Sequence, residues 1–515
     1  MLVKTFGSAV YGVEAVTITV EVNVTEGLHT FIVGLADSAV KESIQRIESA
    51  IKNNGYFMPR TKIVINLAPA GIRKYGAAFD LPIALGILAA SEQLPEYGIL
   101  KDFVVMGELS LDGNIQPIKG ALPIALQSGK EKFRGLILPR QNGAEAAIAK
   151  QLKVYAFTHL REVIGFFRDN ASSDPVIADD RQPLVSNFPP AEIDFNEVKG
   201  QGNIKRGLEI AAAGGHNAIM VGPPGAGKTM LARRLPTILP PLSLQEALET
   251  TKIHSVAGKL PDHTTLLYER PFRSPHHTIS AMALVGGGSI PQPGEISLAH
   301  NGVLFLDELP EFNRSTLETM RQPMEDRKVT ISRAALSVEF PSSFILVASM
   351  NPCPCGYYNH PEKDCTCPPG AVLKYLNRIS GPLLDRIDLH IEVVPVPFAQ
   401  LSTGNTGDSS LQIRQRVMAA REMQRRRYEG QTPAVTYCNA QISGRLLRHF
   451  CRIDGGAEQL LRNAMETLNL SVRAHDHILK ISRTIADLSG SEGIHAEHLA
   501  EAIQFRTLDR QGWAA

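Results

Sequence analysis

The chain has 515 residues, 43% of them hydrophobic and 20% charged, which is typical of a globular protein with two to four domains. A formal net charge of +1 excludes a strongly basic chain, so any surface that binds nucleic acid must be local. The amino terminus lacks a signal-peptide pattern and no apolar run reaches the ~18 residues of a membrane span, so we expect a cytoplasmic enzyme.

The first predicted domain, residues 1–168, is a mixed α/β unit. An amphipathic helix is expected over residues 41–53 and a more apolar helix over residues 80–91. Alternating or continuous apolar residues predict strands over residues 16–24, 62–67, 103–109 and 135–139. Residues 169–194 are rich in Asp, Ser and Pro and predict a linker.

The most informative motif is a glycine-rich loop between a predicted strand, residues 218–221, and a predicted helix that continues through residues 230–235. The loop fits G-x-x-x-x-G-K-[ST], whose backbone N–H groups close around phosphate oxygens at a helix amino terminus. The lysine is expected to reach the β- and γ-phosphates of ATP, and the threonine hydroxyl to ligate Mg²⁺. The eight residues are Gly222, Pro223, Pro224, Gly225, Ala226, Gly227, Lys228 and Thr229.

Residues 276–289 follow and contain the pair His276–His277 and three consecutive glycines. The glycines predict a mobile loop. Two adjacent histidines can suggest a metal site, but no cysteine or third histidine is near in the sequence, so we favour a structural role for them.

A second apolar strand, residues 302–306, ends in two acids. This is the Walker B arrangement, in which Asp307 holds the Mg²⁺ that bridges the phosphates. Glu308 would then orient and polarise the attacking water as a general base. The alternative, a strand followed by two solvated acids, is disfavoured by the P-loop upstream.

Three later positions suit roles around a γ-phosphate. Asn351 ends a predicted buried strand, residues 344–350, and can hydrogen-bond the γ-phosphate or the water. Arg386 lies near the end of an element, where a guanidinium can serve the site of a neighbouring subunit. Arg473 begins a helix and can sense the nucleotide. Spacing alone favours an ordinary surface role for all three.

Four cysteines, Cys353, Cys355, Cys365 and Cys367, lie within one short polar loop. A reducing cytoplasm disfavours two disulfides, and four thiolates suit tetrahedral Zn²⁺ in a closed structural site. Free cysteines remain the alternative, because C-x-C spacing is less common in zinc sites than C-x₂-C. Cys438 and Cys451 are isolated and are interpreted as core residues.

The order of these motifs resembles that in the AAA+ ATPases. The amino-acid sequences of residues 270–278, 351–356 and 481–488 resemble the magnesium-chelatase-like branch of these ATPases. Within that branch the whole chain is similar to the ComM family. The resemblance implies an AAA+ core over residues 195–398 and a helical lid over residues 399–515. It also implies a hexameric ring ATPase that drives DNA branch migration during natural transformation.

The same resemblance assigns roles to individual residues. It implies that Arg386 is a finger acting on the next subunit and that Arg473 is the sensor-2 arginine, acting either within its subunit or across the interface. Residues 276–289 match the helix-2 insert, and residues 327–340 match the pre-sensor-1 hairpin, two strands around Ser332-Arg333-Ala334. Arg333 at the hairpin tip is the leading DNA-binding residue, with Arg327 and Lys328 beside it; an exposed hairpin arginine without this role is the alternative.

A basic span between Arg414 and Arg452 carries nine arginines and only two acids, Glu422 and Glu429. A basic helix can bind DNA phosphates without reading sequence. A solvated face, or a face that contacts an acidic neighbour, is the more common explanation of such a run.

The first domain resembles the peptidase domain of Lon, a ribosomal S5 domain 2-type α+β fold. A Ser–Lys dyad needs a hydroxyl nucleophile and an amine base. The serine position is Ala78 and the lysine position is Leu122, while nearby Lys119 has no serine to activate. The resemblance therefore implies a non-catalytic, ring-forming or DNA-handling module without protease activity. A magnesium chelatase subunit, a protease and a regulatory ATPase without translocation are the competing functions.

Overall fold

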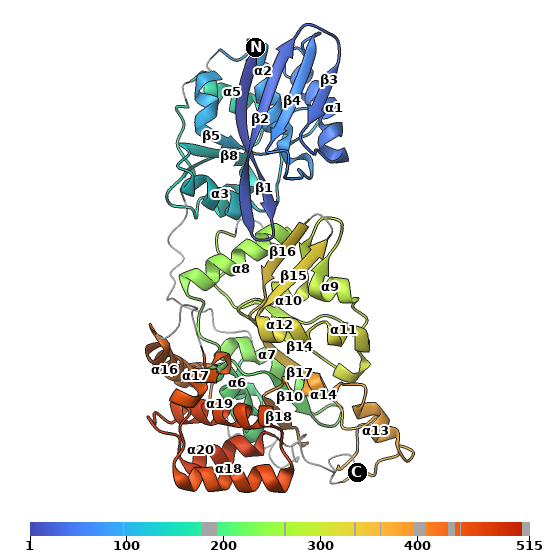
Figure 1. The fold of residues 1–515 in the computed structure, drawn as a ribbon, viewed down its shortest axis with the longest axis vertical. Helices are drawn as coiled ribbons and strands as arrows, with labels where there is room; N and C mark the ends of the chain where they lie inside the picture. Colours follow the sequence, from blue (N-terminus) through green and yellow to red (C-terminus); the bar gives the residue numbers. More distant parts are fainter. Residues whose placement is uncertain are drawn as a thin grey trace.

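The computed structural model describes residues 1–95, 97–169, 171–177, 193–261, 264–333, 336–360, 362–395, 407–430, 438–442 and 444–506. Most of the predicted linker, at residues 178–192, lies outside the described residues, as do residues 396–406. Figure 1 shows three parts along the long axis: an amino-terminal sheet domain, a P-loop domain and a helical lid. No helix in the described ranges is both long and apolar enough to cross a membrane.

The amino-terminal sheet has seven strands among the described residues, in the order β3-β4-β2-β1-β5-β8-β9. The predicted helices and all but one of the predicted strands are confirmed, and the fold is mixed α/β. The strands are β1 (Leu2–Tyr11), β2 (Glu14–Thr25), β3 (Thr30–Val33), β4 (Lys62–Ala68), β5 (Phe103–Val105), β8 (Gly135–Pro139) and β9 (Lys153–Phe157). The helices are α1 (Ser38–Asn53), α2 (Asp80–Ala90), α3 (Ala121–Lys130), α4 (Gly143–Ala146) and α5 (Leu160–Arg168).

The strand predicted over residues 103–109 is wrong in its length. It stops at Val105, and the chain then forms a separate hairpin of β6 (Glu108–Leu109) and β7 (Ile115–Gln116). Gly107 lies at the break: its N–H donates to Ala78 O at 2.9 Å and its carbonyl accepts from Leu81 N–H at 3.0 Å. Its backbone groups are therefore used by α2 and the turn before it rather than by the sheet.

The P-loop domain is built on five parallel strands of the described chain, in the order β11-β14-β17-β10-β18. Its sheet strands are β10 (Ala218–Val221), β11 (Phe272–Arg273), β14 (Val303–Leu306), β17 (Ile345–Met350) and β18 (Leu389–Glu392). Every residue of β10, β14 and β17 is buried, which is typical of a parallel sheet with covered faces. Two small hairpins, β12 (Gly286–Gly287) with β13 (Gln292–Pro293) and β15 (Lys328–Arg333) with β16 (Leu336–Pro341), project from this domain.

Helices cover this sheet and extend it into the lid. The helices of the P-loop domain are α6 (Gly202–Gly214), α7 (Lys228–Ile238), α8 (Leu244–Ala257), α9 (Ala281–Val285), α10 (Glu295–Leu298), α11 (Arg314–Glu318), α12 (Arg321–Asp326), α13 (Ala371–Leu376) and α14 (Gly381–Leu384). The lid helices are α16 (Ser410–Tyr428), α17 (Gly444–Phe450), α18 (Gly455–Leu468), α19 (Val472–Leu488) and α20 (Ala496–Gln504). Lid residues such as Ile478 and Ile485 share one hydrophobic core with α6 and the sheet, and that core includes Cys451; Cys438 is buried as well.

The amino-terminal domain rests on α8 and on the β15–β16 hairpin (Figure 1). Gly120 N–H donates to Ser255 O at 3.2 Å, and the Ser255 hydroxyl donates to the buried Glu145 carboxylate. Gly12, at the tip between β1 and β2, has φ +59°, and a Cβ there would lie 2.7 Å from Val338 Cγ1 of β16. Glycine therefore permits both the turn and the close approach of the domain to the hairpin.

Candidate functional site

The P-loop joins the carboxyl end of β10 to the amino end of α7. Lys228 is 9% exposed, and its Nζ donates to Gly222 O at 2.6 Å, to Pro223 O at 2.9 Å and to Asn351 Oδ1 at 3.0 Å. Gly225 and Gly227 have φ of +76° and +85°, a region that glycine adopts without a steric penalty. The Lys228 amine, which is predicted to bind phosphates, is thus held by oxygens of the loop itself and of Asn351, the residue predicted to contact the γ-phosphate or the water.

The two predicted acids, Asp307 and Glu308, follow β14, which is separated from β10 by β17 in the sheet. Thr229 Oγ1 donates to Asp307 Oδ2 at 2.7 Å, so the predicted magnesium ligands are in direct contact. Glu308 has φ +54°, an uncommon value for a residue other than glycine, and its N–H donates to Ser349 Oγ at 3.4 Å. A backbone held in this region at a candidate active site is consistent with a functional constraint on the glutamate.

Two residues near these acids had no predicted part in the nucleotide site. Ser349 donates its hydroxyl to Asp307 and so fixes the carboxylate on the side opposite Thr229. His277 Nδ1 lies 3.8 Å from Glu308 Oε2, and the His276 and His277 rings are tilted by 33° with centroids 4.1 Å apart. The position of Ser349, two residues before Asn351 on a strand, and the unusual histidine pair were the signals available.

Burial lowers the pKa of Lys228 from its ordinary 10.5 to about 8, and the charges of Asp307 and Glu308 only partly offset this effect. We expect the affinity for a non-hydrolysable ATP analogue to fall above pH 8, by up to about tenfold per pH unit, because the neutral amine loses its attraction for phosphate. Titration calorimetry between pH 7 and 9.5 measures this. Lys228→Arg, which stays protonated, should show a flat profile; a flat wild-type profile would contradict the assignment.

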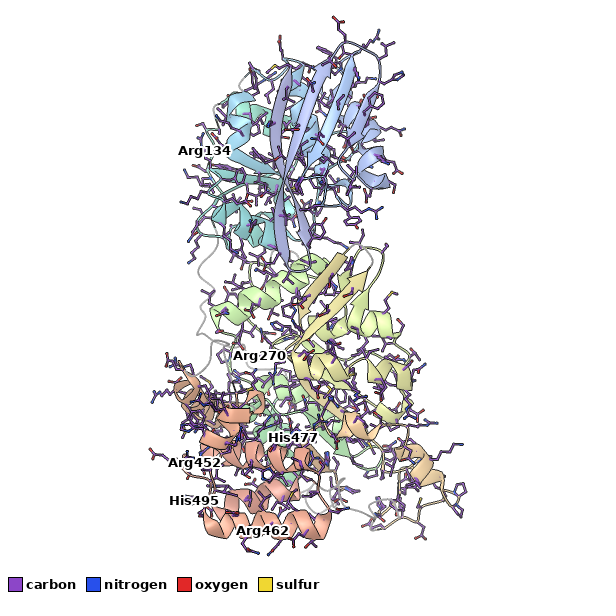
Figure 2. All side chains as sticks on the ribbon, viewed as in Figure 1. Arg134, Arg270, Arg452, Arg462, His477 and His495 are labelled. Carbon is purple, nitrogen blue, oxygen red and sulfur yellow. The ribbon has the colours of Figure 1, made fainter. Side chains whose placement is uncertain are left out.

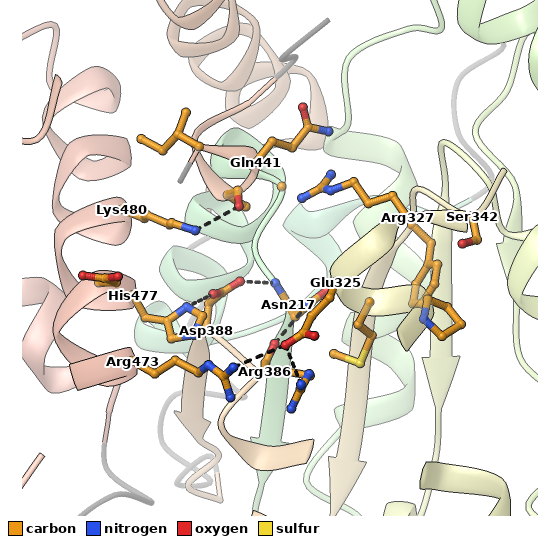
Figure 3. A pocket seen from close by; sticks show the side chains of 17 residues that line it. Asn217, Glu325, Arg327, Ser342, Arg386, Asp388, Gln441, Arg473, His477 and Lys480 are labelled. Carbon is orange, nitrogen blue, oxygen red and sulfur yellow. Dashed lines mark hydrogen bonds and ion pairs between the residues drawn. The ribbon is translucent and has the colours of Figure 1, made fainter. Parts of the chain in front are cut away.

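Arg386 and Arg473 lie together in a different cavity, of about 330 Å³ (Figure 3). Glu325 of α12 pairs with both guanidiniums: with Nη2 of Arg386, and with Nη2 of Arg473 at 3.3 Å. Arg386 Nη1 also donates to Pro382 O at 2.5 Å. One carboxylate therefore holds the predicted finger and the predicted sensor arginine side by side, and Glu325 was not anticipated from the sequence.

The sheet separates these arginines from the P-loop of the same chain. Arg386 precedes β18, whose Leu389 pairs with Ala218 at the amino end of β10. Asn217, one residue before β10, donates its side-chain amide to Arg386 O at 3.2 Å (Figure 3). The P-loop begins at the other end of β10, about 13 Å away for a four-residue strand. Arg386 thus lies at the amino end of these parallel strands, whereas the P-loop lies at their carboxyl end.

The three predicted DNA-binding residues lie in different surroundings. Arg327 directly follows α12, and its side chain lines the cavity of Arg386 and Arg473, with Nη1 3.4 Å from Ser343 Oγ. Lys328 begins β15, is exposed, and pairs across the hairpin with Glu339 at 2.8 Å. Arg333 is the last residue of β15, next to the hairpin turn, and its side chain lies outside the described part of the structure.

The basic span is largely paired with neighbouring groups. Arg425 and Arg426 both bind Glu422, at 2.8 and 2.9 Å, and Arg427 Nη1 donates to Asp487 at 2.9 Å. In Figure 2, Arg452 lies on the outside of the lid. These contacts favour the structural explanation for the centre of the span, because its guanidiniums already have acidic partners.

The four loop cysteines form one cluster. Their sulfur atoms all lie within 4.8 Å of one another, with Cys353 Sγ 3.3 Å from Cys355 Sγ and 3.7 Å from Cys365 Sγ. Tetrahedral Zn–S bonds of about 2.3 Å place sulfurs about 3.8 Å apart. Backbone N–H groups of Cys355 and Tyr358 point at Cys367 Sγ and Cys353 Sγ, at 3.4 and 3.3 Å. The donor set and its spacing fit a thiophilic cation such as Zn²⁺.

The dyad positions of the amino-terminal domain have other uses. Ala78 packs at the edge of an apolar cluster that contains Ala121, and Leu122 is fully buried, its N–H donating to Glu145 Oε1 at 2.9 Å. The Lys119 side chain lies over Gly258 at the end of α8, where a Cβ would be 2.8 Å from Lys119 Cε. The nearby lysine therefore belongs to the contact between domains.

Three family descriptions match this chain. "Magnesium chelatase, subunit ChlI" matches residues 194–401, "Subunit ChlI of Mg-chelatase" matches residues 20–142, and "Magnesium chelatase, subunit ChlI C-terminal" matches residues 407–506. Together they cover most of the sheet domain, the P-loop domain and the lid. They fit the predicted α/β architecture of an AAA+ core with a helical lid.

The chain is also similar over nearly its whole length to named relatives. It is 43% identical to the competence protein ComM of Haemophilus influenzae over 508 residues, 98% of this chain and 97% of that protein. It is 43% identical over 505 residues to the uncharacterized protein YifB of Salmonella typhimurium, covering 98% and 96%. A partial match, 33% over 172 residues, covers 31% of this chain and 29% of Lon protease 2 of Bacillus subtilis and fits the Lon-like domain.

Proposed function

The chain belongs to the ComM family of magnesium-chelatase-like AAA+ ATPases, and from this premise we propose that it is a cytoplasmic, ring-forming motor acting on DNA. It couples ATP hydrolysis to translocation and promotes branch migration during natural transformation or homologous recombination. The partners are single-stranded and branched duplex DNA and further copies of the chain, in a hexamer. The single observation that carries the ring is the position of Arg386 at the sheet edge opposite its own P-loop.

Each half of the site then has its own task. Lys228 and the P-loop N–H groups bind the phosphates of ATP. Thr229 and Asp307 hold Mg²⁺, an assignment supported by the direct contact of their side chains at 2.7 Å. Glu308 activates water, and Asn351 orients it or the γ-phosphate. Arg386 of the neighbouring subunit stabilises the transition-state charge, worth roughly 10³–10⁵ in rate. Because Arg473 shares the carboxylate of Glu325 with Arg386, we assign it to the same, trans-acting side.

DNA contact is assigned to the β15–β16 hairpin. Arg333 next to the hairpin turn and the exposed Lys328 on β15 supply positive charge to phosphates, without sequence readout. Arg327 faces the arginine cavity, which favours a role there rather than on the hairpin. The amino-terminal domain touches the same hairpin through Gly12, which supports a DNA-handling module without a protease dyad. Zn²⁺ in the cysteine cluster completes the cofactors as a structural ion.

An alternative function is an ATPase that remodels a partner other than DNA, as the magnesium-chelatase family descriptions suggest. The same P-loop site serves both functions, so hydrolysis alone does not separate them. Unwinding of a forked or four-way junction separates them, because only the DNA motor performs it. Active ATPase without junction unwinding would favour the alternative.

The hairpin assignment is tested by Arg333→Ala. We expect this variant to keep its basal ATPase rate and to lose junction unwinding, because the charge that grips the moving strand is gone. Gel or fluorescence assays of unwinding, run beside ATPase assays, measure both. Arg462→Ala, on an exposed arginine of α18 (Figure 2), is the matched control and should unwind normally. Undiminished unwinding by Arg333→Ala would reject the hairpin as the DNA contact.

A further inference from the structure

The segment between Asn351 and α13, residues 352–370, contains the four clustered cysteines and is called the cysteine loop below. It lies directly against the P-loop. It starts next to Asn351, the residue that accepts a hydrogen bond from Lys228. Gly356 of the loop has φ +85°, and a Cβ there would lie only 2.5 Å from Cδ of Pro224. Glycine is therefore required both for the backbone conformation and for the close packing of this loop on the P-loop.

A cavity of about 500 Å³ opens between these two loops. P-loop residues 223–227 line one side, and the segment before α6, Glu197 to Gln201, lines another. Gln201 Nε2 donates to Ala226 O at 2.9 Å and joins these two walls. The third wall comes from the cysteine loop. Because backbone N–H groups of the P-loop take the phosphates, the other two walls face the ribose and the base.

The third wall presents an aromatic ring held from two sides. Lys363 Nζ lies 4.9 Å from the centroid of the Tyr357 ring, and the His360 ring meets Tyr357 edge-on, at 5.6 Å and 77°. His360 Nδ1 accepts from the N–H groups of Glu362 and Lys363, at 3.0 and 3.1 Å, so it shapes the turn and is not in the cysteine cluster. A fixed aromatic face beside a cation suits stacking with a purine base.

The shape of this wall depends on the cysteines. Between β17 and α13 the described residues form neither helix nor strand, and many side chains there are exposed. Contacts among the cysteine sulfurs, such as 3.6 Å between Cys355 Sγ and Cys365 Sγ, bring the two ends of the loop together. A cation that binds four thiolates would hold such a loop in one conformation.

We propose that the cysteine loop, held by Zn²⁺, forms the wall of the nucleotide pocket that contacts the base, so that zinc occupancy sets nucleotide affinity. The ligand is a purine nucleoside triphosphate, stacked on Tyr357. This inference rests on the proposed ATPase function. It gives the cluster a part in nucleotide recognition in addition to its structural one.

The test uses the full-length protein and three measurements: zinc content by mass spectrometry, affinity for a non-hydrolysable ATP analogue, and affinity for inorganic tripolyphosphate, which lacks a base. Cys365→Ser is expected to lose zinc and to bind the analogue at least about fivefold more weakly, since stacking of one base is worth that much. Tyr357→Ala is expected to keep its zinc and to show the same weakening. Neither variant should change tripolyphosphate affinity by more than about twofold, because the P-loop is intact.

Two glycines provide a matched pair. Gly356 and Gly370 lie in the same loop with φ of +85° and +77°, so alanine at either position has a similar backbone cost. A Cβ at Gly370 meets nothing within 4 Å, whereas one at Gly356 meets Pro224. We expect both alanine variants to keep zinc and only Gly356→Ala to weaken analogue binding.

The proposal is overturned if zinc-free Cys365→Ser binds the analogue with wild-type affinity, or if Tyr357→Ala does. Equal analogue affinities of Gly356→Ala and Gly370→Ala would also overturn it. Failure of the ATPase proposal gives a different result: zinc-loaded wild-type protein would then bind neither the analogue nor tripolyphosphate. Circular dichroism of each variant separates a local change from unfolding, and Tyr357→Ala retains every cysteine if Cys365→Ser does not fold.

Discussion

Subunits carrying Lys228→Ala and subunits carrying Arg386→Ala are each expected to lack ATPase activity, whereas an equimolar mixture should recover about one quarter of the wild-type rate. Lys228→Ala removes the phosphate anchor of its own site. Under the proposed trans arrangement, Arg386→Ala removes the finger from the site of the neighbouring subunit, a loss of roughly 10³–10⁵ in rate. In a randomly mixed ring, about one interface in four joins an intact P-loop to an intact arginine.

The mixing experiment discriminates between the two possible directions of Arg386. If the arginine served its own subunit, every subunit of the mixture would carry one defect and no activity would return. The reason to expect recovery is the sheet: Arg386 precedes β18 and the P-loop follows β10, at opposite ends of two parallel strands. Arg378→Ala is the control, since this exposed arginine pairs with Glu311 at 2.8 Å and should keep full activity.

Glu308→Gln is expected to bind ATP and to hydrolyse it at least about 10²-fold more slowly than the wild type. The amide keeps the size of the side chain but cannot take a proton from the attacking water. Lys228, Thr229 and Asp307 are unchanged, so nucleotide affinity and the nucleotide-bound ring should persist. Steady-state ATPase assays together with size-exclusion chromatography in ATP measure both properties.

The control for this variant is Glu311→Gln, a nearby carboxylate that pairs with Arg378 and has no contact with the P-loop among the described residues. It should hydrolyse ATP at the wild-type rate. Rapid hydrolysis by Glu308→Gln would move the general-base role to another residue. His277, 3.8 Å from Glu308, would then be the first residue to examine.

Much of the candidate site was accessible from the order of residues. The P-loop, the two Walker B acids and Asn351 each follow a short apolar strand, and parallel strands bring their carboxyl ends to one edge of the sheet. The direct contacts of Lys228 with Asn351 and of Thr229 with Asp307 agree with that expectation. The four cysteines were likewise close enough in the chain to predict a cluster, which the sulfur distances now describe.

Other features needed the tertiary structure because they join residues far apart in the chain. Glu325 of α12 holds both Arg386, which lies before β18, and Arg473, which lies in α19. No local sequence pattern marks such a carboxylate. The same holds for Lys119 over Gly258 and for Gly12 against Val338, where one domain meets another. The strand predicted past Val105 failed for a related reason: Gly107 bonds to a distant turn instead of the sheet.

The sequence by itself determined which chemical groups this protein carries: a loop with the G-x-x-x-x-G-K-[ST] pattern, two acids after an apolar strand, and four cysteines close together in the chain, all defined by residue type and short spacing. The tertiary structure decided which of these groups face one another. It put the P-loop at one edge of the sheet and Arg386 at the other, and it laid Gly356 of the cysteine loop on Pro224. The physical reason is that strand direction and close packing depend on the whole fold, whereas catalytic groups are specified one residue at a time.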